Sequence, residues 1–62
     1  MKTIELRNYV LFSTFRNRAG YYQGQEIVDC GLMGACNKYW IALNDGTKKT
    51  SLDRLERVQI AE

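Results

Sequence analysis

The pair Asp45-Gly46 lies between two strand-like runs, residues 38–44 and 47–51, and constrains the fold more than any other feature of this chain. An Asp-Gly pair flanked by alternating apolar positions favours a two-residue type I′ hairpin loop. With that loop, one face of the hairpin carries the natural core side chains, Tyr39, Ile41, Leu43, Thr50 and Leu52. The opposite face carries Trp40, Ala42, Lys49 and Ser51. Trp40 is then at the surface beside Lys38 and Lys49; a register shifted by one residue would instead place it in the core.

The N-terminal half of the chain predicts a second hairpin. Residues 3–16 are rich in β-branched and aromatic side chains, which favours a strand. Alternation puts Ile4, Leu6, Val10 and Phe12 on one face and Tyr9, Leu11 and Phe15 on the other. Residues 17–20 are typical of a hairpin loop in which Gly20 supplies a positive φ. Residues 21–30 form the return strand with a kink at Gly24, and the small residues of 30–36 form a loop.

The C-terminal segment allows two structures. Thr50 and Asp53 have the spacing of a capping box, so a helix to Ile60 is one of them. A single turn followed by a strand over residues 57–60 is the other. We favour the turn and strand, because that arrangement buries a larger apolar set, Leu52, Leu55, Val58 and Ile60.

This order of short strands, a tight hairpin, one turn and a last strand resembles an SH3-like small barrel, and residues 38–58 look like its closing half. Tudor and KOW-type modules, Sm-like folds and the type II dihydrofolate reductases share that layout. Leu55-Glu56-Arg57-Val58 is similar to the reductase ending, but the reductase's Val-Gln-Ile-Tyr position holds residues 48–51, Lys-Lys-Thr-Ser, here. The resemblance therefore implies a mostly β, five-stranded SH3-like barrel with a short helical turn before the last strand, without reductase activity.

Composition limits the chemistry that the chain can perform. Its 62 residues allow one domain, residues 1–62, and small domains of this size often gain stability by oligomerising. The absence of histidine removes the usual nucleophile systems and the commonest metal ligand. No phosphate-binding glycine loop is present. We therefore expect a binding protein rather than an enzyme, with no cofactor and no metal. Without a long apolar segment, we expect a cytoplasmic protein that does not contact a membrane.

Two groups of basic and aromatic residues indicate nucleic-acid binding, because cations pair with phosphates and aromatic rings stack on bases. The first group flanks the predicted loop at 17–20 and consists of Arg16, Arg18, Tyr21 and Tyr22. The second lies around the Asp45-Gly46 hairpin and consists of Lys38, Trp40, Lys48 and Lys49. The structural alternative for the first group is a solvated loop with core aromatics beneath it. Whether the two groups form one patch is left open by the sequence.

Two other functions are compatible with the sequence. A protein-interaction module, such as a phage- or plasmid-encoded modulator of a host protein, would use Leu32, Met33 and Trp40 as anchors. A homo-oligomer could bind a small molecule in a central pore, as the reductase comparison implies. Cys30 and Cys36 are expected to be plain small residues, although their spacing also allows a local disulfide or a zinc site shared by a dimer.

Overall fold

A computed structural model describes residues 1–61 as a mostly β fold with two short helices. Glu62, the last residue of the predicted domain 1–62, lies outside the described residues. The elements in chain order are β1 (Lys2–Glu5), α1 (Leu6–Leu11), α2 (Ser13–Arg16), β2 (Gly20–Tyr22), β3 (Gln25–Met33), β4 (Lys38–Leu43), β5 (Lys48–Leu52) and β6 (Arg57–Ile60). The mostly β class predicted from the sequence is confirmed.

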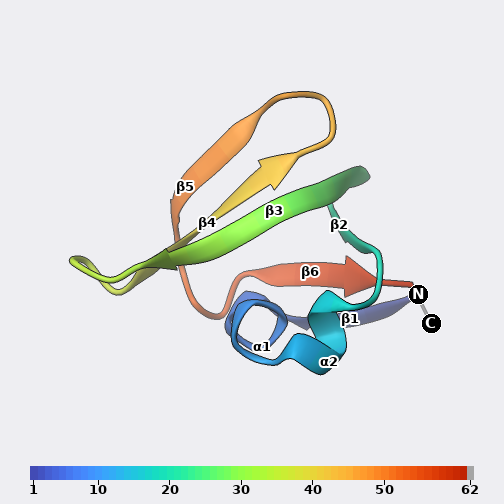
Figure 1. The fold of residues 1–62 in the computed structure, drawn as a ribbon, viewed down its shortest axis with the longest axis horizontal. Helices are drawn as coiled ribbons and strands as arrows, with labels where there is room; N and C mark the ends of the chain where they lie inside the picture. Colours follow the sequence, from blue (N-terminus) through green and yellow to red (C-terminus); the bar gives the residue numbers. More distant parts are fainter. Residues whose placement is uncertain (62) are drawn as a thin grey trace.

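The strands form one six-stranded antiparallel sheet in the order β1-β6-β2-β3-β4-β5. Its ends, β1 and β5, are not paired with each other among residues 1–61, so the sheet is open and the five-stranded barrel is not confirmed. Figure 1 shows β3, β4 and β5 extending away from β1, β6 and the helices, with short β2 where the two halves meet. The core lies between these halves and is made of Ile4, Leu6, Tyr9, Val10, Tyr22, Ile27, Cys30, Tyr39, Ile41, Leu43, Val58 and Ile60.

The predicted strand over residues 3–16 is wrong beyond Glu5, because the chain turns into α1 and α2 there. Leu6, Tyr9 and Val10 are buried, which is the spacing of one helix face rather than of a strand. Leu11 and Phe12 are exposed. The β propensity of these residues favoured a strand, but the tertiary contacts of the buried residues stabilise a helix instead.

Backbone groups from the other end of the chain stabilise the start of α1. Glu5 precedes α1 and gives it no side-chain cap. Instead, the N–H of Leu6 donates to the carbonyl oxygen of Glu56 at 2.6 Å, and the N–H of Arg7 donates to that of Arg54 at 3.0 Å. These bonds satisfy two N–H groups that a helix start leaves without an intrahelical partner. The helix therefore depends on the turn before β6.

The loops around β2 and β3 also differ from the prediction. Residues 17–19 connect α2 to β2, which begins at Gly20, so the predicted loop at 17–20 does not close a hairpin. The hairpin turn lies at Gln23 and Gly24, whose φ angles are 51° and 85°, a pair of positive values that fits a type I′ loop. Gly20 has no positive φ; a Cβ there would lie 2.5 Å from the ring of Tyr9, so close approach explains this glycine. Residues 30–33, expected in a loop, are the end of β3.

The Asp45-Gly46 hairpin is present, but its loop is not type I′. Only Gly46 has a positive φ, 92°. The N–H of Gly46 donates to the carbonyl oxygen of Leu43 at 3.0 Å, and the N–H of Leu43 donates to that of Thr47 at 2.8 Å. This is a type I turn followed by a left-handed glycine, the commonest three-residue hairpin loop.

The longer loop shifts the register of β5 by one residue. Ala42 is opposite Lys48, and Ile41 is opposite Lys49. An irregularity at Ser51, whose φ is 58°, then restores the predicted pairing of Tyr39 with Leu52. As a result Lys48, not Lys49, shares a face with Ala42, because directly opposed residues point to the same side of a sheet.

The C-terminal segment is a turn followed by β6, so the favoured alternative is confirmed. The turn is held by the N–H of Leu55, which donates to the Asp53 carboxylate at 2.8 Å, and by the N–H of Glu56, which donates to the Asp53 carbonyl at 3.0 Å. Val58 and Ile60 are buried and Leu52 packs against the core, whereas Leu55 is 49% exposed, so its predicted burial is wrong.

Candidate nucleic-acid interface

Trp40 lies on the outer face of the sheet. Along β4, Tyr39, Ile41 and Leu43 are buried, and the alternate residues Lys38, Trp40 and Ala42 are partly exposed. This period-two pattern confirms that β4 points one row of side chains into the core and the other toward solvent. Trp40 is thus on the surface row that the hairpin pattern predicted for it.

The indole of Trp40 rests on Gly31 of the neighbouring strand. Gly31 is directly opposite Trp40 in the β3–β4 pairing. A Cβ at Gly31 would come within 2.5 Å of the Trp40 Nε1 atom, so only glycine leaves room for the ring. The absence of a side chain on β3 therefore lets a large aromatic ring lie against the sheet surface.

Two lysines accompany the ring. The Nζ of Lys48 lies over the Trp40 ring, 4.5 Å from its centroid, in cation–π geometry. Lys38 is two residues before Trp40 on the same row, and its Nζ is 4.0 Å from the Asp53 carboxylate. We call Lys38, Trp40 and Lys48 the Trp40 platform. Lys49, opposite the core residue Ile41, belongs to the other face of β5.

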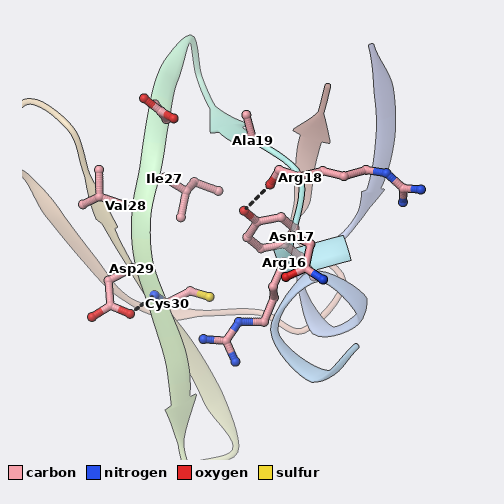
Figure 2. A pocket seen from close by; sticks show the side chains of 10 residues that line it. Arg16, Asn17, Arg18, Ala19, Ile27, Val28, Asp29 and Cys30 are labelled. Carbon is pink, nitrogen blue, oxygen red and sulfur yellow. Dashed lines mark hydrogen bonds between the residues drawn. The ribbon is translucent and has the colours of Figure 1, made fainter. Parts of the chain in front are cut away.

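The arginine group forms a separate site. A cleft of about 400 Å³ separates the α2–β2 connection from β3 and is lined by Tyr9, Arg16, Asn17, Arg18, Ala19, Glu26, Ile27, Val28, Asp29 and Cys30. Figure 2 shows Arg16 directed toward Cys30 and the side chain of Arg18 directed away from β3. The carbonyl oxygen of Arg18 accepts a hydrogen bond from the Tyr9 hydroxyl at 3.2 Å.

Burial controls the ionisation of the groups at the base of this cleft. It raises the pKa of the Cys30 thiol, and the nearby Arg16 guanidinium opposes part of that rise. It also raises the pKa of the Tyr9 hydroxyl, with a further contribution from Cys30. Both groups therefore favour their neutral forms. Glu26 and Asp29 bring negative charge to the same cleft, which does not favour a polyanion there.

The remaining predicted site residues are not gathered on the Trp40 platform. Tyr22 is buried in the core, and Tyr21, partly buried, is opposite Glu26 and Gln59 in the sheet. Arg16 approaches β3 on the side of Cys30, a core residue, whereas Trp40 covers Gly31 on the outer face. The two basic groups therefore do not merge into one patch in this structure.

The three predicted protein-binding anchors are also divided between faces. Leu32 is opposite Tyr39, and Met33 is opposite Lys38, so the two side chains point to opposite sides of β3. Leu32 is 48% exposed. Met33 lies near Ser51, whose N–H is 3.3 Å from the Met33 sulfur.

Cys30 is buried and Cys36 is exposed, and both are free thiols in the described chain. Within residues 1–61, no group of three acidic or cysteine side chains comes together as a metal site. The same residues contain no helix that is long and apolar enough to cross a membrane.

Sequence reasoning missed Gly31, which supports Trp40, because it placed residues 30–36 in a loop. The pattern that could have identified it is the continued strand spacing of the apolar residues Ile27, Cys30 and Leu32 around it, with one irregularity at Val28.

The fold and its outer face define a small, mostly β protein with an open antiparallel sheet and an exposed aromatic residue flanked by lysines. No family model matches this chain, and no curated protein or solved structure is detectably similar to it. The resemblance to SH3-like barrels therefore stays a prediction.

Proposed function

We propose that this protein binds nucleic acid through the Trp40 platform on the outer face of β3, β4 and β5. The observation that carries the proposal is the arrangement of Trp40 itself: its ring rests on Gly31, and Lys48 lies 4.5 Å from its centroid on the solvent side. An aromatic ring held against a sheet, with lysines around it, offers both a stacking surface and phosphate partners.

Each part of the platform matches one part of a nucleotide. Base–aromatic stacking contributes about 1–3 kcal/mol per base and tolerates any base. Lysine contacts to phosphate release counterions and make affinity depend on salt. Lys48 is exposed on β5, an edge strand, so a phosphate backbone could follow that edge while a base stacks on Trp40. The platform predicts weak sequence preference, because none of these contacts distinguishes one base from another.

The arginine cleft is not part of the proposed interface. Arg16 is directed toward Cys30, and two carboxylates line the same cleft. We accordingly expect the charge of Arg16 and Arg18 to affect nucleic-acid affinity less than that of Lys38 and Lys48.

Because Trp40 is the single tryptophan of the chain, its fluorescence reports directly on the platform. Titration with a short single-stranded oligonucleotide should quench the emission, and the binding constant should fall as salt rises. Replacing Lys38 with alanine should reduce the slope of log affinity against log salt by about 1. Lys2→Ala is the matched control, because Lys2 is an exposed lysine on β1 at the opposite edge of the sheet.

Two results would overturn the proposal. The first is the absence of quenching at low salt. The second is quenching whose salt dependence is reduced equally by Lys38→Ala and Lys2→Ala, since that would place the contact outside the platform. In either case the protein-interaction hypothesis would replace it.

A further inference from the structure

The ring of Trp40 has two close neighbours in the described structure. On one side, the Nε1, Cε2 and Cζ2 atoms along one edge of its indole lie against Gly31, so closely that a single added methyl group would clash. Its outer face is covered by the Lys48 ammonium, 4.5 Å from the centroid. A base that stacks on this face of Trp40 therefore has to displace the Lys48 ammonium.

Lys48 is free to make that movement. It is exposed on the edge strand β5, and its cross-strand neighbour is the small residue Ala42. Among residues 1–61 no carboxylate lies within ion-pair distance of its Nζ, whereas Lys38 has Asp53 at 4.0 Å. The contact with the ring is then the one interaction that the described structure gives the Lys48 ammonium, and cation–π contacts at exposed sites are weak.

The position of Trp40 also selects the form of the ligand. It lies on β4, which has β3 on one side and β5 on the other, and it is partly buried. A ring in that position cannot project as a wedge between stacked base pairs. It can accept only the flat face of a base, and in a duplex those faces are covered by neighbouring bases.

We infer that the ligand is single-stranded nucleic acid and that Lys48 is a displaceable cover on Trp40. In the free protein the ammonium lies over the ring. When an unpaired base stacks, Lys48 leaves the ring and pairs with a phosphate of the same strand. This inference rests on the proposed nucleic-acid function and adds the strand type and the role of Lys48.

The cover predicts opposite effects of one substitution on two ligands. A neutral nucleoside has no phosphate, so displacing Lys48 is uncompensated, and Lys48→Ala should strengthen nucleoside binding about two- to five-fold, the equivalent of one exposed cation–π contact. A single-stranded oligonucleotide gains the phosphate contact, so the same substitution should weaken its binding and reduce the salt slope by about 1.

The experiment uses the full chain and three probes: adenosine, a short oligodeoxyadenylate, and the same strand annealed to its complement. Binding is followed by the chemical shift of the Trp40 indole N–H, which is insensitive to adenosine absorbance. Lys49→Ala is the matched control, because it removes the adjacent lysine of β5 from the face opposite the ring. We expect it to leave adenosine binding unchanged.

Three results would overturn the inference. Weaker adenosine binding by Lys48→Ala would make Lys48 an ordinary contact and not a cover. Equal affinity for single strand and duplex would refute the strand selectivity. In both of these cases the oligonucleotide still binds, so the proposed function survives. If the unmodified protein binds neither strand form, the proposed function fails and the inference fails with it.

Discussion

Replacing Gly31 with alanine tests the packing on which the Trp40 platform depends. The added Cβ would lie 2.5, 2.7 and 2.8 Å from three atoms of the indole. Ordinary carbon contacts begin near 3.5 Å, so the ring must move outward by about 1 Å. Inserting a methyl group into a packed site costs about 1–3 kcal/mol. Alanine recovers about 0.5–1 kcal/mol relative to glycine inside a strand.

The difference between these terms gives a net loss of about 1 kcal/mol in the free energy of unfolding, because Trp40 is at the surface and can relax. In a domain of this size that loss lowers the melting temperature by about 4–8 °C. The same movement exposes the indole, so its fluorescence emission should shift to the red. Urea unfolding followed by Trp40 fluorescence measures both effects in one experiment.

Gly34→Ala is the matched control for this substitution. Gly34 follows β3 in the turn to β4 and has no positive φ, and a Cβ at this position would meet open space. We expect it to change neither stability nor emission. Equal stability and equal emission of the two variants would show that the ring does not rest on Gly31, and the argument for the platform would fail with it.

Two further predictions test the core and the cleft. Val10→Ala should lower the free energy of unfolding by about 2 kcal/mol because Val10 is buried. Leu11→Ala, at a position 58% exposed, should change it by less than about 0.5 kcal/mol. Comparable losses for the two variants in urea unfolding would contradict the α1 helix. Stability should fall as the pH rises above about 9, the ordinary thiol pKa, because the buried Cys30 thiol keeps a raised pKa and stays protonated in the folded state while the unfolded chain releases its proton. In Cys30→Ala this loss should begin only near pH 10, where Tyr9 and Tyr22, whose pKa values are also raised by burial, start to contribute. If the urea midpoints of the unmodified protein and of Cys30→Ala had superimposable pH profiles, the loss above pH 9 would not come from Cys30.

The N-terminal error shows how far local sequence could determine this fold. Residues 6–11 contain two β-branched or aromatic side chains, Tyr9 and Val10, and their helical spacing extends over less than two turns. Isolated helices this short are not stable in water. What stabilises α1 is burial together with two backbone bonds to Glu56 and Arg54. Those partners are distant in sequence, so no local window contains the information.

The hairpin shows the opposite case, in which local chemistry gave most of the answer. Its strands, its turn position and the pairing of Tyr39 with Leu52 followed from Asp45-Gly46 and alternation. The loop length was wrong by one residue, and the irregularity at Ser51 compensated for that error at the far end. Between the loop and Ser51, the register is shifted by one residue, so Lys48 and Lys49 each point to the face predicted for the other. The sequence therefore correctly predicted a lysine on the face of Trp40, but it named Lys49. In the structure, that lysine is Lys48, which lies over the ring.

The bonds from Leu6 and Arg7 to Glu56 and Arg54 have a consequence for biosynthesis. β1 likewise pairs with β6, with Lys2 opposite Ile60. While the chain emerges from the ribosome, residues 2–7 therefore have to wait for residues 54–60 to be synthesised before they acquire their native partners. Contacts this distant slow folding. Until then the apolar segment around Tyr9, Val10 and Leu11 is available to chaperones, and to other nascent copies at high expression.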